Sequence, residues 1–171
     1  MNQAADRAAF EVGLRSSEVV GDELRLVLNN TIAAIEDGRQ QILRRLEPLG
    51  LSARVVNRLE VVFEEVVSNI VRHGFEPHSD QTILVVVATR PGAVDLTVED
   101  DGAPFDPLAA PEPEPLRSLE TARLGGLGVP LLRKLSASLR YEAPDPGAAP
   151  RDLGGRPFRP RNRLMLSIAT E

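Results

Sequence analysis

The sequence predicts an α+β domain, a two-layer sandwich in which a mixed, mostly antiparallel sheet carries helices on one face. Three observations support this fold class. Apolar residues recur every three or four positions between residues 31 and 73, which predicts amphipathic helices. Two apolar, strand-like segments, 81–90 and 93–101, are joined by the tight turn Pro91–Gly92. The chain has 171 residues, enough for one such domain with its own core.

The elements follow one another along the chain with clear boundaries. Residues 1–21 are polar and Ala-rich and are predicted to form a poorly ordered lead-in or a short extra helix, before a domain at 22–171. Ser52 is the expected N-cap of the second long helix. The expected elements are an edge-type strand at 22–30, helices at 31–46 and 52–73, strands at 81–90 and 93–101, a helix at 128–137, and strands at 139–143 and 163–169.

Two proline-rich segments interrupt this pattern. The stretch from Pro104 to Pro115 contains five prolines, so it can form neither a regular helix nor a central strand and is predicted to be a loop. Residues 143–161 contain five prolines and four arginines. This composition predicts a long, mobile hairpin insertion.

Composition excludes several classes of function. The formal net charge of −5 argues against nucleic-acid binding, which needs a basic face. The chain has no cysteine, which excludes disulfides, thiolate metal sites and a Cys nucleophile. Because no run of about 18 apolar residues and no signal peptide is recognisable, we expect a cytoplasmic protein without a membrane partner. Lys134 is the single lysine, and no P-loop glycine pattern precedes it, so a nucleotide would have to be bound in another way.

A carboxylate and an amide lie one turn apart in the second predicted helix. Glu65 and Asn69 are four residues apart and therefore share one side of the helix. This pattern alone also fits an ordinary solvated helix face. An Asn oxygen is a suitable Mg²⁺ ligand, and a nearby carboxylate can take a proton from an attacking hydroxyl. Glu64 is the alternative carboxylate, but it points about 100° away from Glu65.

An acidic turn and a glycine turn complete the set of candidate motifs. VEDDGAPFDP at 98–107 ends a strand, and a buried carboxylate there could accept a hydrogen bond from the exocyclic amine of adenine. GGLG at 125–128 leads into a helix, whose first amides could contact phosphate oxygens. Taken singly, the first is also a common turn and the second also a flexible loop.

In order and spacing, the three segments resemble the ATP-binding domain of the GHKL superfamily, which includes gyrase, heat-shock chaperones, histidine kinases and MutL. The variant GAPFDP resembles the branch of anti-sigma factor serine/threonine-protein kinases. The resemblance implies the Bergerat ATP-binding fold, with ATP and Mg²⁺ as cofactors. It also implies a catalytic base at Glu65, a metal ligand at Asn69, and ATP contacts from Asn69, Asp100, Gly102, Arg123, Gly125, Gly126 and Gly128.

The resemblance leaves some positions open. Arg117 is the alternative to Arg123 for the γ-phosphate. Members of this branch often carry a Thr in the last strand, and the matching position here is Met165, with Ser167 nearby. His73 is expected to have a structural or pocket-lining role rather than to be a phosphoacceptor.

The function implied by the resemblance is an Mg-ATP-dependent serine/threonine protein kinase that acts as an anti-sigma factor. Such a protein phosphorylates a serine of a STAS-domain anti-anti-sigma partner, binds a sigma factor and forms a homodimer. One alternative is a partner-switching protein that binds ATP weakly or not at all and acts by sequestration. The other, a histidine-kinase catalytic domain, is disfavoured because no helix pair with a phosphoacceptor His precedes the motifs.

Overall fold

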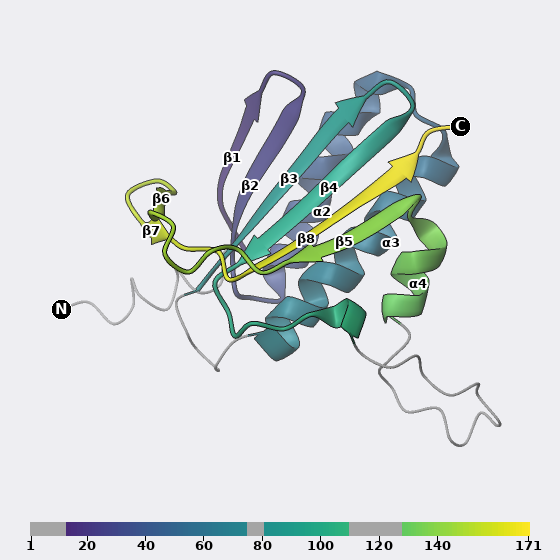
Figure 1. The fold of residues 1–171 in the computed structure, drawn as a ribbon. Helices are drawn as coiled ribbons and strands as arrows, with labels where there is room; N and C mark the ends of the chain where they lie inside the picture. The colour runs from purple at the N-terminus through teal and green to yellow at the C-terminus, as the bar shows by residue number, and fades with distance from the viewer. Residues whose placement is uncertain (1–12, 75–80, 110–127) are drawn as a thin grey trace.

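The structure, a computed structural model, describes residues 13–74, 81–109 and 128–171. Helices cover one face of a six-stranded sheet with the strand order β1-β2-β3-β4-β8-β5 (Figure 1). This confirms the predicted α+β class with helices on one face. Every neighbouring pair in this sheet is antiparallel, so among the described strands the sheet is not mixed.

The elements alternate between hairpins and helices along the chain. Each lies within a few residues of its predicted range, apart from β1. The main sheet and its helices comprise β1 (Leu14–Val20), β2 (Glu23–Asn29), α2 (Ala33–Leu46), α3 (Ala53–Asn69), β3 (Thr82–Arg90), β4 (Ala93–Asp100), α4 (Gly128–Leu135), β5 (Ser138–Glu142) and β8 (Asn162–Ala169).

The N-terminal part of the sheet differs from the prediction. The chain forms strand β1 at Leu14–Val20, where the sequence predicted a poorly ordered lead-in or a helix. β1 pairs with β2 in an antiparallel hairpin, so β2 is an inner strand and not an edge strand. The prediction failed because LRSSEVV is mostly exposed and lacks the apolar alternation of a half-buried strand.

Helix α3 supplies much of the core. Ser52 caps it as expected, since its hydroxyl accepts a hydrogen bond from the Val55 amide at 3.4 Å. Six apolar residues form a stripe along α3, as the sequence predicts, and this stripe faces the sheet. Five of the six are buried, namely Leu59, Val62, Phe63, Val66 and Val67. Because this stripe fixes the rotation of the helix, it also decides where the polar side of α3 lies.

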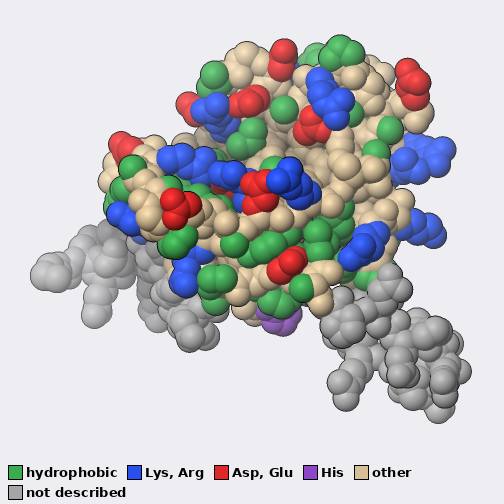
Figure 2. Space-filling model, in the orientation of Figure 1, with side chains coloured by type: hydrophobic (Ala, Val, Ile, Leu, Met, Phe, Trp, Pro, Cys, Tyr) green, Lys and Arg blue, Asp and Glu red, His purple; other side chains and the backbone are tan. Residues whose placement is uncertain are grey.

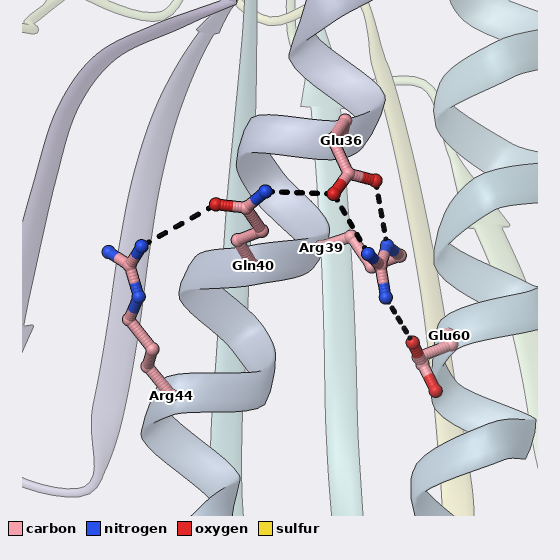
Figure 3. Close-up of polar contacts among 5 residues, drawn as sticks. All are labelled: Glu36, Arg39, Gln40, Arg44 and Glu60. Atoms are coloured by element: carbon pink, nitrogen blue, oxygen red, sulfur yellow. Dashed lines mark hydrogen bonds and ion pairs between the residues drawn. The ribbon is translucent and has the colours of Figure 1, made fainter.

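An ion-pair network joins α2 to α3 at the surface. Arg39 donates to both carboxylate oxygens of Glu36 on its own helix and reaches Glu60 on α3 at 2.9 Å (Figure 3). Hydrogen bonds from Arg39 and Gln40 lower the pKa of Glu36 to about 2. The Arg39–Glu60 pair is partly exposed, and ion pairs near the surface contribute little to stability, so the helix contact depends mainly on packing.

The insertion at 143–161 folds back onto the outer face of the sheet. It contains the short hairpin β6 (Arg151–Asp152) and β7 (Pro157–Phe158). Phe158 is only 1% exposed and packs with Val27 and Leu84 on the face opposite the helices. The predicted hairpin is therefore present, and a buried aromatic residue, which the composition did not single out, packs it against the sheet.

None of the described helices is long and apolar enough to cross a membrane.

Gly38 on α2 allows the two long helices to approach closely. A Cβ at this position would lie 2.5 Å from the Phe63 ring, which is fully buried. We therefore expect Gly38→Ala to lower the free energy of unfolding by about 1–3 kcal/mol through overpacking, although Ala favours a helix by about 1 kcal/mol over Gly. Urea unfolding measures the change. Adding Phe63→Leu to Gly38→Ala should recover part of the loss, and a Gly38→Ala variant as stable as the wild type would contradict the packing argument.

Candidate functional site

Asp100 is a buried carboxylate at the end of β4, on the face of the sheet that meets the helices. Strand alternation places it in line with the core residues Leu96 and Val98, and it is 4% exposed. Its Oδ1 accepts hydrogen bonds from the Gly102 amide and from Asn162 Nδ2, each at 2.9 Å. Within the described residues, no donor bonds Oδ2. One oxygen of Asp100 is therefore held by the protein, and the other can accept a hydrogen bond from a ligand.

Asn162 fixes this carboxylate and the turn that follows it. It is the first residue of β8 and pairs directly with Asp100 across the strands. Its Nδ2 also donates to the Ala103 carbonyl at 3.0 Å, and its Oδ1 accepts from the Phe105 amide and the Tyr141 hydroxyl, each at 2.9 Å. The amide group thus makes four hydrogen bonds, and three of them go to residues of the acidic turn. Asn162 is a site residue that the sequence analysis missed.

Burial raises the pKa of Asp100 above its usual value. The hydrogen bonds from Asn162 and Gly102 oppose this shift, while the neighbouring Asp101 carboxylate adds to it. The charged form of Asp100 is therefore costly in the folded protein. A buried carboxylate with a raised pKa is more typical of a binding site than of a structural contact.

Helix α3 brings the predicted Glu65 and Asn69 to the same end of the two layers. Glu65 is half-buried, whereas Asn69, the last residue of α3, and the alternative Glu64 are exposed. A Cβ on Gly128 would lie 3.1 Å from Glu65 Oε2. Because the first residue of α4 has no side chain, the Glu65 carboxylate can lie against the start of that helix. The structure thus brings the first and third sequence motifs together.

The end of α3 is also tied to the acidic turn. Residues Ile70–Gly74 continue the helix as a π-helical turn, an irregularity that is frequent at functional sites. The Gly74 carbonyl accepts a hydrogen bond from the Ala103 amide at 3.2 Å. This bond joins the helix that carries Glu65 to the turn that follows Asp100. His73 lies exposed on the same π-helical turn.

The last strand does not place Met165 or Ser167 at the site. Both have the opposite parity to Leu164 and Leu166, which pack in the core, so they lie on the outer face of the sheet. Ser167 there bonds Asp95 and Arg90. Met165 and Ser167 therefore lie away from Asp100, and Asn162 is the β8 residue beside that carboxylate.

Four predicted contacts cannot be placed. Arg123, Gly125 and Gly126, together with the alternative Arg117, lie outside the described residues.

The donor set suits a magnesium ion that is shared with a ligand. Asn69 and Glu65 offer oxygen ligands, the type that Mg²⁺ prefers. Among the described residues, no group of three or more His, Asp or Glu side chains gathers as a metal cage. A metal here would therefore take most of its ligands from water and from substrate phosphates, which is the usual coordination of protein-bound Mg²⁺.

Comparison with known proteins shows a family for this chain. Residues 28–149 match the family described as the histidine kinase-like ATPase domain. The chain is also similar to the serine/threonine-protein kinase BtrW of Bordetella bronchiseptica, with 35% identity over 94 residues. That alignment covers 55% of this chain and 66% of BtrW, slightly less than two thirds of the relative's length.

Removal of the Asp100 charge should not destabilise the folded protein at neutral pH. In Asp100→Asn the remaining oxygen can still accept from Gly102 and Asn162, but no charge is buried. A raised folded-state pKa means that the contribution of Asp100 to stability is greatest below the unfolded carboxyl pKa of about 3.9 and falls as pH rises through the folded pKa. We expect Asp100→Asn to be at least as stable as the wild type at pH 7 and to lose this advantage towards pH 4. Urea unfolding across this range tests the prediction, with the exposed Asp106→Asn as control. An Asp100→Asn variant that is much less stable at pH 7 would contradict it.

Loss of the Asn162 amide should destabilise the turn strongly. Asn162→Ala leaves the partly buried Tyr141 hydroxyl without its acceptor and removes one of two bonds to the buried Asp100, and a buried group that loses its partner costs about 1–3 kcal/mol. Tyr141→Phe is the matched control, because it removes only one of the four bonds and should cost about 1 kcal/mol. Chemical unfolding of both variants gives the comparison. Equal losses in the two variants would show that Asn162 does not organise the turn.

Proposed function

Because the chain belongs to the histidine kinase-like ATPase family, we propose that it is an Mg²⁺-ATP-dependent serine/threonine protein kinase that acts in the cytoplasm as an anti-sigma factor. The observation that supports this proposal most is the buried Asp100 carboxylate, which the described residues bond through one oxygen and leave open at the other. A carboxylate held in this way can accept a hydrogen bond from the amine of adenine and reject bases that lack it.

Each predicted residue then has a chemical task. Asp100 and the Gly102 turn bind the adenine, and the amides at the start of α4 near Gly128 bind phosphate oxygens. Asn69 holds Mg²⁺, which neutralises charge on the phosphates as they react. Arg123 is assigned to the γ-phosphate on the resemblance alone.

Glu65 is proposed to act on the protein substrate. Its carboxylate takes the proton from the serine hydroxyl as the serine oxygen bonds to the γ-phosphorus and the bond to ADP breaks. The position of Glu65 beside Gly128 supports this role, because it places the base next to the helix start where phosphates would bind. Glu64, one residue earlier, is exposed and is not in this position.

The partners are proposed from the resemblance described above. The protein substrate is a serine of a STAS-domain anti-anti-sigma protein, a sigma factor is the second partner, and the kinase works as a homodimer. The name of the similar BtrW protein, a serine/threonine-protein kinase, supports the reaction type.

A second function uses the same site without phosphoryl transfer. The insertion is packed against the sheet through Phe158 and therefore presents an ordered surface. Such a surface favours a function in binding partner proteins. In this case the chain would bind ATP weakly or not at all and regulate by sequestering a sigma factor or STAS protein.

Phosphoryl transfer from labelled ATP to STAS-domain proteins of the same organism distinguishes these functions. We expect transfer by the wild type and a loss of about 10²- to 10⁴-fold in Glu65→Gln, the usual contribution of a general base. Glu64→Gln is the matched control and should keep full activity. Asn69→Ala should weaken ATP binding in Mg²⁺ and change it little in EDTA.

Two outcomes would contradict the kinase mechanism. Full transfer by Glu65→Gln would remove Glu65 from the reaction. Weak or absent ATP binding, with no transfer to any STAS-domain protein, would favour the sequestering function instead.

A further inference from the structure

The insertion lines a basic hollow, and one of the lining residues, Arg161, also adjoins the proposed ATP site, because its amide bonds the Asp100 carbonyl. The hollow has a volume of about 770 Å³ and lies between the two limbs of the insertion, next to the ends of β5 and β8. Four arginines line it, Arg151, Arg159, Arg161 and Arg163, against two acidic residues, Glu142 and Asp145. All four arginines follow residue 149, the last residue of the family match.

The excess of positive charge is local. The whole chain has a formal net charge of −5, whereas the charged residues of the hollow are four arginines and two acids. Basic side chains gather beside the β6–β7 hairpin on the face shown in Figure 2. The remaining lining consists of alanines and prolines, which add apolar surface between the charges.

Two of the arginines are held rigidly by a buried acid. Glu99 is 4% exposed and bonds Arg151 through one oxygen and Arg163 through the other, the latter at 2.6 Å. The Arg151 guanidinium also lies 5.3 Å from the centre of the Phe158 ring. Each guanidinium has five N–H donors, so Arg151 and Arg163 keep donors for a ligand after bonding Glu99.

The other two arginines are available. Arg159 and Arg161 are exposed, and within the described parts of the chain neither guanidinium makes an ion pair or a hydrogen bond. The two acids of the lining are already engaged. Glu142 bonds Arg140 and Arg163, and Asp145 accepts the Gly147 amide. The hollow therefore offers many donors and few free acceptors, which selects an anionic ligand.

We propose that this hollow binds a short acidic segment of a partner protein. Its volume lies in the range of about 300–1,000 Å³ that is typical of ligand sites, which suits a few side chains but neither a duplex nor a bilayer. Carboxylates match the bidentate geometry of arginine, and the alanine and proline surface accommodates apolar side chains between them. The proposal does not depend on ATP binding or on kinase activity.

Fluorescence anisotropy with the full chain tests the proposal. The probes are a panel of labelled eight-residue peptides, each with four Glu among apolar residues, and the same peptides with Gln for Glu. We expect Glu peptides to bind at least tenfold more tightly than their Gln counterparts and to weaken between 50 and 200 mM salt. The double variant Arg159→Ala, Arg161→Ala should lose at least tenfold in affinity.

The control is Arg44→Ala, which removes the same type of charge from α2 on the opposite face of the sheet. It should bind the peptides like the wild type, and circular dichroism should show that all variants fold. Equal binding of Glu and Gln peptides across the whole panel, or unchanged affinity of the double variant, would overturn the proposal. Competition by inorganic phosphate as effective as that by the Glu peptides would instead assign the hollow to a small free anion.

Discussion

The hydrogen bond between the Asn162 amide and the Asp100 carboxylate is the contact on which the proposed site depends. It joins two adjacent strands at the point where both leave the core, and it is buried on the helix side of the sheet. A buried carboxylate is costly without donors, so Asp100 can keep this position only because Asn162 and the Gly102 amide satisfy one of its oxygens. The same amide bonds the main chain of Ala103 and Phe105, so the turn and the carboxylate are held as one unit.

The two faces of the sheet have different roles in this account. The helix face carries Glu65, Asp100 and the start of α4. The apolar stripe of α3 turns Glu65 towards α4, and the π-helical turn connects α3 to the acidic turn. The outer face carries the insertion. Phe158 packs the insertion against the sheet, and Glu99 bonds arginines of the basic hollow. Arg161 lies between the proposed ATP site and the basic hollow, because its amide bonds the Asp100 carbonyl while its side chain lines the hollow.

Periodicity in the sequence predicted the helices, the central hairpin and the shared helix side of Glu65 and Asn69, because each follows from local spacing. The choice of Asp100 came from the family resemblance. It did not predict β1, whose residues are mostly exposed and form a strand only by pairing with β2. Asn162 was missed because its bonds span about 60 residues, although a signal existed: it shares parity with the buried Leu164, Leu166 and Ile168. A polar residue in the apolar phase of a strand requires a partner. The packing of the insertion on the sheet was missed for a similar reason, because it depends on one residue, Phe158.

The central claim is that Asp100 recognises the exocyclic amine of adenine. Calorimetric titration with ATP and with inosine triphosphate, which carries a carbonyl oxygen in place of that amine, tests it most directly. The account predicts that ATP binds at least about tenfold more tightly, the contribution of one hydrogen bond to a charged group, and that Asp100→Asn removes the difference. Equal affinity of the wild-type protein for the two nucleotides would contradict it.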